Sequence, residues 1–304
     1  MSLLVLSEQD VERLLTMEEC VEAMADVLTA LAREELYQPL RFMLRPPGAS
    51  GLMGFMPAHR GGAGGAFSLK EIVVVPGNSA RGLDAHQGGV LLHDGETGEL
   101  RALLNASPVT AIRTAAVSAV ATRALARPGA RTVAIIGTGV QGNAHADAMR
   151  AVLDEPEIRM WSRSKGGSAE DVVRDADVVC TCTTSAEPVL RREWLAAGAH
   201  VNAVGSSIPS ARELDEETIR AATLVVDRRE SALNESGELL IPGFGAERIA
   251  AELGEVLTGA HPGRTEGDEL TVFKSLGLAV EDLAAAELVV RRAREQGAGV
   301  EVDF

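Results

Sequence analysis

The chain has 304 residues and a formal charge of −15; 46% of its residues are hydrophobic and only 3% are aromatic. This length suits two ordinary domains whose cores are filled mainly by Ala, Val, Leu and Ile. An acidic chain lacks the basic surface that binds phosphate backbones and anionic lipids, so the composition argues against nucleic acid and membrane partners.

No targeting or membrane segment is expected. The N-terminal MSLLVLSEQD has no basic region and soon turns polar, and no apolar run is long enough to span a bilayer. Cys20, Cys180 and Cys182 do not form a disulfide framework. These features predict a cytoplasmic protein. The six histidines show no ligand spacing, so no metal is predicted.

The first third of the chain predicts an α+β unit. Ser7 to Asp10 is a helix-start signal, and apolar residues follow at helical spacing over 16–34. Short strands separated by Gly and Pro are then expected at 41–44, 51–56, 67–75, 88–94 and 99–105.

From about residue 107 the pattern changes to that of a parallel sheet. A helix is expected over 107–125, followed by apolar strands at 132–137, 158–161, 177–184, 199–205 and 223–227. Continuous apolar strands separated by helices indicate a Rossmann-type doubly wound α/β domain. Residues 271–297 predict one or two helices that return to the first domain. The expected division is 1–112 with 278–304 for substrate binding and dimerisation, and 113–277 for the dinucleotide.

A glycine motif predicts the dinucleotide site. Gly137, Gly139 and Gly142 follow a buried strand and begin a helical run. In this setting the first glycine permits a tight turn, the second lets the backbone approach a pyrophosphate, and the third permits close helix–strand packing. Val140 and Gln141, at the start of the helix, join the predicted cofactor contacts.

The tip of the next strand favours NADP(H). An acidic residue there would bind the ribose 2′-OH and repel a 2′-phosphate, but the chain has Ser162 and Arg163, with Lys165 nearby. If Arg163 is only a solvated loop residue, NAD(H) remains possible.

Five more polar residues are candidates for the active site. Arg41 and Lys70 lie in the strand-rich part, Arg113 and Thr114 lie in the helix that leads to the nucleotide domain, and Asp227 ends a strand. Ligands of open parallel sheets bind at the carboxyl ends of the strands, which favours Asp227. It could instead cap the next helix, Lys70 could be an exposed strand residue, and Arg45 could serve in place of Arg41.

The sequence closely resembles the ornithine cyclodeaminase/mu-crystallin family over nearly its whole length. The resemblance is carried by QPLR, GFMPA, SLKEIVVV, HQGGVLL, TAIRTAAVSAVATRAL, IIGTGVQG, HVNAVGSS, RELD, VVDRRESALNESGE and TVFKSLGLAVED. The ketimine-reducing, mu-crystallin-like branch looks nearer than the ornithine branch.

The resemblance implies roles for the candidate residues. Arg41 and Arg113 would bind the substrate carboxylate, Lys70 would contact the carboxylate or the reacting nitrogen, and Asp227 would exchange a proton near that nitrogen. Thr114, Ser206, Leu276 and Gly277 would complete the cofactor site. It also implies a homodimer formed by the strand-rich domain.

The expected activity is NAD(P)H-dependent reduction of the C=N bond of a cyclic or linear imino acid to an amino acid. Two alternatives within the enzyme class are an ornithine cyclodeaminase, which uses NAD catalytically, and an amino-acid dehydrogenase. A third alternative is a crystallin-like protein that only binds a small ligand.

One stretch departs from the family pattern. Only 13 residues separate Arg163 from Asp177, where relatives would place a helix, a strand and a further helix. Lys165-Gly166-Gly167-Ser168 is typical of a flexible linker. The sequence therefore predicts a nucleotide domain trimmed at this edge of its sheet, unless the stretch is an ordinary Gly-rich loop.

Overall fold

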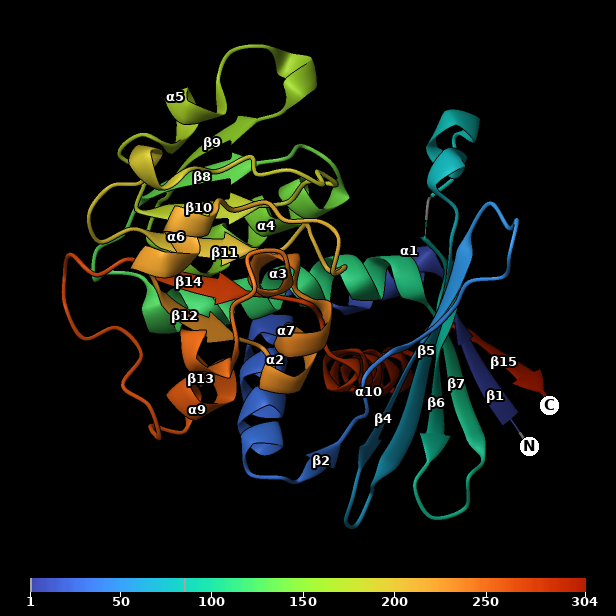
Figure 1. Cartoon of the computed structure of the whole chain (residues 1–304). Helices are drawn as coiled ribbons and strands as arrows, with labels where there is room; N and C mark the ends of the chain where they lie inside the picture. The colour runs from blue at the N-terminus through green and yellow to red at the C-terminus, as the bar shows by residue number, and fades with distance from the viewer. Residues whose placement is uncertain (1, 85) are drawn as a thin grey trace. The chain divides into compact units, whose positions relative to one another are not determined.

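A computed structural model describes residues 2–84 and 86–304. The chain forms two compact units (Figure 1). Unit 1 consists of the residues up to Arg113 together with Leu278–Phe304, and unit 2 is the continuous segment Thr114–Gly277. The second unit is therefore inserted into the first.

Unit 1 is built on a sheet with strand order β15-β1-β7-β6-β5-β4-β2, and β3 also pairs with β4. Its strands are β1 (Ser2–Leu6), β2 (Leu36–Tyr37), β3 (Phe42–Leu44), β4 (Leu52–Arg60), β5 (Ala66–Val74), β6 (His86–Asp94), β7 (Leu100–Asn105) and β15 (Val300–Asp303). Its helical segments are α1 (Glu8–Leu14), α2 (Met17–Ala32), η1 (Pro76–Arg81), the start of α3 (Ala106–Leu125), and α10 (Ala279–Gln296).

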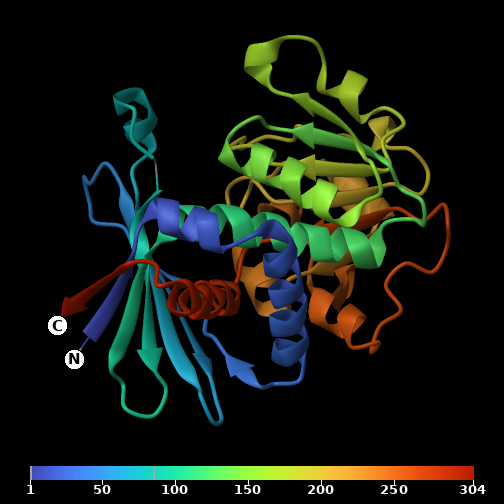
Figure 2. The same cartoon turned by 180° about the vertical axis from the view of Figure 1, so that it is seen from behind.

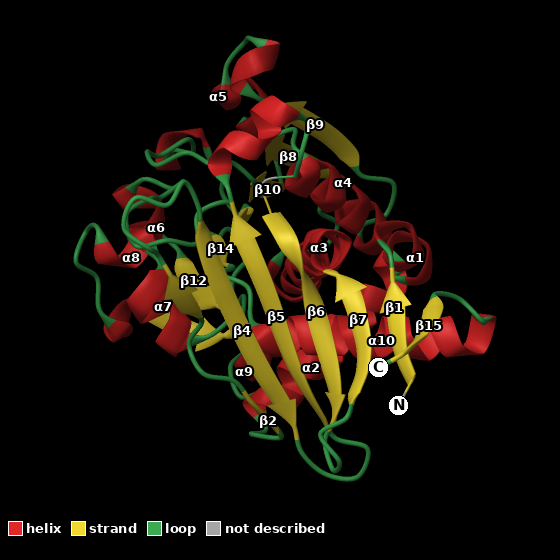
Figure 3. Cartoon of the chain, turned by 90° about the vertical axis from the view of Figure 1, so that its right-hand side faces the viewer, coloured by secondary structure: helices red, strands yellow, loops and turns green. Residues whose placement is uncertain are grey.

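The two faces of this sheet differ. Helix α10 contacts β4, β5 and β6, and it also packs on α2. Figure 3 looks onto the opposite face, with β4 to β7 in front of α10 and α2. Alternation along β5 follows this division, because Ser68 and Lys70 are buried on the helix side whereas Phe67 and Val73 are exposed on the other. We call these the inner and outer faces.

Local sequence explains where the unit 1 helices begin. Ser7 and Asp10 form a reciprocal capping box at α1, as the sequence predicts, and Thr16 caps α2. Helix α10 is apolar over most of its circumference and carries many small residues, which suits a helix buried between α2 and the sheet. It ends at Gly297, whose φ is 61°.

Unit 2 contains an entirely parallel sheet with strand order β13-β12-β14-β11-β10-β8-β9. Its strands are β8 (Thr132–Ile136), β9 (Glu157–Trp161), β10 (Val178–Thr181), β11 (His200–Ala203), β12 (Thr223–Val226), β13 (Ile249–Glu252) and β14 (Thr271–Lys274). The helices are α4 (Val140–Val152), α5 (Ala169–Val173), α6 (Glu216–Ala221), α7 (Arg229–Glu235), α8 (Gly237–Leu240) and α9 (Leu253–Leu257), with short turns η2 (Arg163–Lys165), η3 (Arg192–Trp194) and η4 (Ala246–Arg248).

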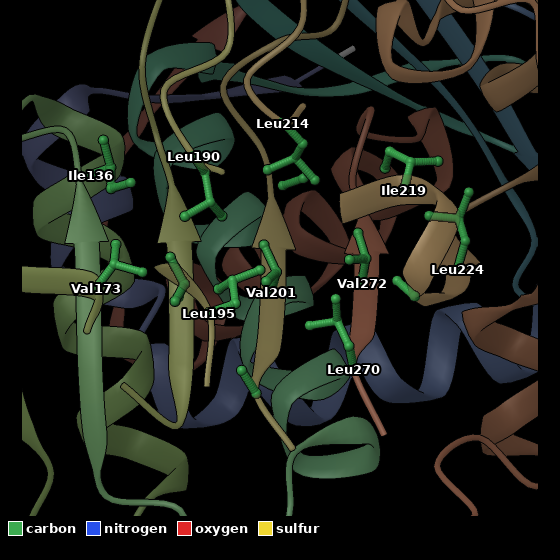
Figure 4. Packing of buried hydrophobic residues seen from close by; sticks show 14 of the residues in the cluster. Ile136, Val173, Leu190, Leu195, Val201, Leu214, Ile219, Leu224, Leu270 and Val272 are labelled. Carbon is green, nitrogen blue, oxygen red and sulfur yellow. The ribbon is translucent and has the colours of Figure 1, made fainter. Parts of the chain in front are cut away.

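Both faces of this sheet are covered, as in a doubly wound α/β fold. Figure 2 shows α4 and the C-terminal part of α3 crossing one face. On the other face an apolar core joins the strands to α5, α6 and the connecting segments. Figure 4 shows part of this cluster, including Leu190, Leu195, Val201, Leu214 and Val272. The structure confirms the predicted α/β class with an added α+β unit.

The trimmed edge is also present. Strand β9 is the last strand of the sheet, and the segment between Ser164 and Ala176 contains only the end of η2 and the five-residue α5. No further strand pairs with β9 within residues 114–277. The edge strand that the family pattern places after the first helix of this segment is therefore missing.

One sequence prediction is wrong. The stretch at Thr271–Lys274 was expected to be helical, but it forms β14, in the middle of the sheet between β11 and β12. The helix begins only at Ala279, after Gly277 with φ of 81° breaks the chain direction. All four residues of this strand are buried, so burial does not alternate along it and its pattern cannot be told from that of a buried helix. Strands β1, β2, β13 and β15 were not predicted either.

Candidate functional site

Four buried charged side chains meet in unit 1. Lys70 lies on the inner face of β5, Arg113 on α3, and Glu281 and Asp282 in the first turn of α10. Lys70 Nζ lies 2.9 Å from Asp282 Oδ1 and 2.8 Å from Oδ2. Arg113 donates from Nε to Asp282 Oδ1 at 3.0 Å and from Nη1 to Glu281 Oε2 at 2.5 Å. We call these four residues the charge cluster.

The cluster balances two cations against two anions away from water. All four residues are at most 4% exposed. An isolated buried charge is costly, so each cation needs the neighbouring carboxylates. Burial and the Arg113 guanidinium lower the pKa of Lys70 to about 8, and Asp282 opposes that shift. Burial alone would lower the pKa of Arg113, but Asp282 and Glu281 outweigh it and raise it.

The structure thus brings together two of the predicted substrate residues. Lys70 is buried rather than exposed, and Arg113 is its neighbour through the shared Asp282. Arg41, just before β3, also contributes to the lowering of the Lys70 pKa, so it lies within electrostatic reach of the ammonium. Cations that converge in this way can bind a carboxylate by charge-assisted hydrogen bonds.

In unit 2 the glycine motif forms the turn between β8 and α4. Gly137 has φ of 121°, and a side chain there would overlap the carbonyl of Cys182 at the end of β10. A side chain at Gly142 would overlap the carbonyl of Gly137. Both glycines are therefore required by the close approach of backbone segments.

Gly139 is different because it faces open space. An added Cβ at Gly139 would meet nothing within 4 Å, and no side chain caps the start of α4. Val140 begins the helix with 68% of its surface exposed, and Gln141 follows it. The uncapped N–H groups and the helix dipole suit an anion, so these residues fit the pyrophosphate of a dinucleotide.

The end of β9 has a hydroxyl and a guanidinium in place of a carboxylate. Arg163 donates from Nη2 to Ser185 Oγ at 3.0 Å, across the end of β8. The hydroxyl groups of Ser162 and Ser164 lie 3.0 Å apart. Arg163 is exposed, and its hydrogen bond links the end of β9 to the segment that follows β10.

Asp227 and the residues after β14 form one unit at the carboxyl edge of the sheet. Asp227 Oδ2 accepts hydrogen bonds from the backbone N–H groups of Leu276 at 2.6 Å and Gly277 at 2.8 Å. Its Oδ1 accepts one from Arg228, the N-cap of α7, at 2.8 Å. Asp227 therefore has a structural contact at the start of α7, and it also fixes the two residues predicted to line the nicotinamide.

The remaining two predicted cofactor residues are buried. Thr114, on α3 next to Arg113, is 8% exposed, and Ser206 follows β11 and donates to the carbonyl of Ala211 at 2.5 Å. Ser206 also accepts a hydrogen bond from Lys274 through its carbonyl. These contacts fix the ends of β11 and β14 at the edge where ligands of such sheets bind.

Several residues of the charge cluster and of the carboxyl edge of the unit 2 sheet were not predicted from the sequence. Glu281 and Asp282 were not proposed, although they partner Lys70 and Arg113. In unit 2, Glu213 is buried and accepts hydrogen bonds of 2.7 Å from Thr181, Thr183 and Gly205, which joins the ends of β10 and β11. Burial raises the pKa of Glu213. The only signal for it was its place in the quoted segment RELD.

Two features are absent from the part of the chain that the structure describes. No group of three or more His, Cys, Asp or Glu side chains there could hold a metal ion. No helix among the same residues is long and apolar enough to cross a membrane.

Comparison with known proteins places these features in context. The sequence pattern of the ornithine cyclodeaminase/mu-crystallin family matches residues 1–169 and 164–297. Ketimine reductase mu-crystallin of Mus musculus is 42% identical over 268 residues, which cover 83% of this chain and 84% of that protein. A Delta(1)-pyrroline-2-carboxylate reductase of Bacillus cereus is 37% identical, and the match covers 99% of this chain and 100% of that protein.

Two solved structures share the fold over their whole length. Delta(1)-pyrroline-2-carboxylate reductase of Thermococcus litoralis, in complex with NADH and L-proline, has a TM-score of 0.93 and 34% identity, covering 98% of this chain and 100% of that one. An archaeal alanine dehydrogenase dimer with bound NAD has a TM-score of 0.94 and 32% identity, and the match covers both chains completely.

The comparisons also bear on the trimmed edge. The alignment with the Bacillus cereus relative spans 327 positions against the 304 residues of this chain, so at least 23 positions have no counterpart here. The two matched parts of the family pattern meet at residues 164–169. That meeting point coincides with the linker after β9.

Proposed function

Because the chain belongs to the ornithine cyclodeaminase/mu-crystallin family, we propose that it is an NAD(P)H-dependent reductase that converts the C=N bond of an imino acid to an amino acid. The observation that carries the proposal is the pair of Lys70 and Arg113, buried together and within reach of Arg41. An imine next to a carboxylate needs cations for the carboxylate and a proton for the nitrogen, and this cluster offers both.

The residues divide the work as follows. Arg113 and Arg41 hold the carboxylate and so orient the imine carbon. Lys70 contacts the carboxylate or gives a proton to the nitrogen, and Asp227 is a proton donor or acceptor in the reaction. Leu276 and Gly277, held by Asp227, would line the nicotinamide, with Thr114 and Ser206 as further contacts. When bound, the reduced nicotinamide supplies the hydride.

NADP(H) is the preferred cofactor in this proposal. The glycine turn and Val140 to Gly142 would hold the pyrophosphate, and Ser162 and Arg163 would bind the 2′-phosphate. Support comes from the Arg163 guanidinium, which donates to Ser185 beyond the end of β10. Ser162 and Arg163 also stand at the positions where an acidic residue would repel a 2′-phosphate. Relatives in solved structures carry NADH or NAD, so NAD(H) is also expected to bind.

The outer face of the unit 1 sheet supports a homodimer. Phe42, Leu44, Phe67 and Val73 are between 39% and 62% exposed there, and Phe42 lies against Phe55 with 5.9 Å between ring centroids. Large apolar patches on a sheet face usually mark an interface. A second copy is the proposed occupant, because a structurally similar relative is described as a dimer.

A substrate panel with both cofactors tests this function. Purified protein is mixed with NADPH or NADH and Δ1-pyrroline-2-carboxylate, its six-membered homologue, or linear imino acids, and absorbance is followed. Net cofactor oxidation with one of them is the expected result. Release of ammonia and proline from ornithine, with catalytic NAD and no net cofactor turnover, would instead identify a cyclodeaminase. Binding without turnover in every case would contradict the enzymatic proposal.

A further inference from the structure

Asp282 is the one side chain of the charge cluster that contacts both cations. Each of its oxygens lies within 2.9 Å of Lys70 Nζ, and Oδ1 also accepts from Arg113 Nε at 3.0 Å. Its side chain is fully buried. The ammonium and the guanidinium are therefore tied to one carboxylate on a third element, α10.

Its neighbour Glu281 pairs with Arg113, one of the two cations. Glu281 Oε2 accepts from Arg113 Nη1 at 2.5 Å and is equally buried, but the interactions of Lys70 involve Asp282. Both acids lie in the first turn of α10, where the helix dipole favours a negative charge. The chain thus offers two adjacent buried acids, of which Asp282 pairs with both cations and Glu281 pairs with Arg113.

On the basis of the proposed function, we propose that Asp282 is the positioning residue of the substrate site. Its carboxylate holds the Lys70 ammonium and the Arg113 guanidinium at a fixed separation and keeps Lys70 in its charged form. Asp282 itself contacts the two cations and not the reacting atoms.

The charges around Lys70 explain why one carboxylate matters. Arg113 on α3 and Arg41 before β3 both disfavour a positive charge on Lys70, as does burial, and Asp282 on α10 favours it. His86 on β6 also interacts with Lys70. The pKa of about 8 that results leaves the ammonium form dominant at neutral pH. Both proposed roles of Lys70 need that form, because only an ammonium attracts a carboxylate or gives up a proton.

The test compares pH profiles of kcat/KM for the wild-type chain, Asp282→Asn and Glu281→Gln with the preferred imino acid. Activity of the wild type should fall as the pH rises through about 8. Removing the Asp282 charge should lower the pKa of Lys70. The alkaline limb of the profile, where kcat/KM falls as the pH rises, should therefore lie about one pH unit or more lower in Asp282→Asn. Glu281→Gln also loses a partner of Arg113, but its limb should stay within about 0.3 pH unit of the wild type.

A conservative variant distinguishes lost positioning of the cations from a defect in folding. Asp282→Glu keeps the charge but moves it by one methylene, so it should retain the alkaline limb and lose about tenfold or more in kcat/KM. Thermal unfolding reports whether each variant is folded. If Asp282→Asn does not fold, Asp282→Glu decides, and wild-type kcat/KM in that variant would overturn the inference.

The outcomes separate the inference from the proposed function. A wild-type chain that reduces no imino acid in the panel would overturn the proposed function and this inference together. An active wild type whose Asp282→Asn variant keeps the same alkaline limb would overturn the inference alone. Equal shifts in Asp282→Asn and Glu281→Gln would also overturn it, since they would indicate a general effect of lost charge.

Discussion

Asp227 Oδ2 accepts a hydrogen bond of 2.8 Å from the backbone N–H of Gly277, and this bond joins the end of β12 to the chain that follows β14. Asp227→Asn would turn one oxygen into a donor that cannot accept these N–H bonds. We expect the variant to lose about 1–3 kcal/mol of unfolding free energy and about a hundredfold or more in kcat. Urea unfolding and steady-state turnover measure the two effects.

A matched control separates stability from catalysis in this prediction. Asp215 caps α6 by accepting from the N–H of Thr218 at 2.9 Å, and it also accepts from Arg192. Asp215→Asn should therefore cost similar stability while turnover stays near that of the wild type. Equal losses of turnover in both variants would show that Asp227 acts only as a brace.

Two glycines of the turn should respond in opposite ways to alanine. Gly139 has open space around it and φ of −79°, so Gly139→Ala should fold normally but weaken NADPH binding about tenfold or more, because the methyl group meets the pyrophosphate. Gly142→Ala should destabilise the chain by about 1–3 kcal/mol, because the methyl group overlaps the Gly137 carbonyl. Fluorescence titration and thermal unfolding distinguish the two; a destabilised Gly139→Ala with unchanged affinity would contradict the assignment.

Arg163 should control the choice between NADPH and NADH. Arg163→Ala removes the guanidinium at the end of β9, so the ratio of kcat/KM for NADPH to that for NADH should fall about tenfold, or about 1.4 kcal/mol. The matched control is Arg159→Ala on β9, the strand that precedes Arg163, since Arg159 pairs with Glu157 at 2.8 Å. A ratio that changes equally in both variants would rule out a specific phosphate contact.

Two buried histidines predict a loss of stability in mild acid. Burial lowers the pKa of His145 to about 4 and that of His200 to about 3, below the usual value near 6.5. The unfolded chain therefore takes up more protons than the folded chain below about pH 6.5, and stability should fall as the pH decreases toward 4. The slope should reach about 1.4 kcal/mol per pH unit for each histidine.

Urea unfolding at pH 7, 6 and 5 checks this slope. His145 bonds to Ser118 Oγ at 2.9 Å and to the Gln141 carbonyl at 2.7 Å, so His145→Gln keeps a polar side chain that no longer titrates. That variant should be less stable at pH 7 but have a shallower pH dependence. An unchanged slope would assign the acid sensitivity to other groups.

The outer face of the unit 1 sheet should carry the dimer interface. Phe55→Glu on β4 would place a charge beside Phe42 on β3, and a charge buried without a partner is strongly unfavourable. We expect a monomer in analytical ultracentrifugation at concentrations where the wild type is a dimer. Ile241→Glu in unit 2, at a side chain that is 46% exposed, is the control and should leave the mass unchanged. A dimeric Phe55→Glu would place the interface elsewhere.

Local patterns accounted for much of the fold. The glycine turn between β8 and α4 follows from three residues at fixed spacing, and the start of α1 follows from Ser7 and Asp10. Strands β1 and β15 were beyond such patterns, because they pair with each other across almost the whole sequence. The prediction of a helix at β14 was wrong for a different reason, since all four residues of that strand are buried and no alternation marks it.

The candidate site was predictable only in part. Lys70 and Arg113 attract attention as cations among apolar neighbours. Asp282 does not, because acidic residues in the first turn of a helix are common and usually solvated. Its importance comes from contact with Lys70, which lies 212 positions earlier in the sequence. That proximity is a property of tertiary packing, and one sequence alone does not contain it.

The insertion of unit 2 into unit 1 has a consequence for synthesis on the ribosome. Unit 2 is continuous, so it can fold as soon as it has emerged, whereas unit 1 must wait for Leu278–Phe304. Until α10 arrives, Lys70 and Arg113 lack both of their carboxylate partners and cannot be buried without a large penalty. The nascent N-terminal strands therefore remain open to water. The 191 residues that follow Arg113, up to Phe304, take about 10–40 s to synthesise at about 5–20 residues per second. The same four charges that we propose for the substrate site thus delay collapse of the N-terminal segment until the last helix completes it.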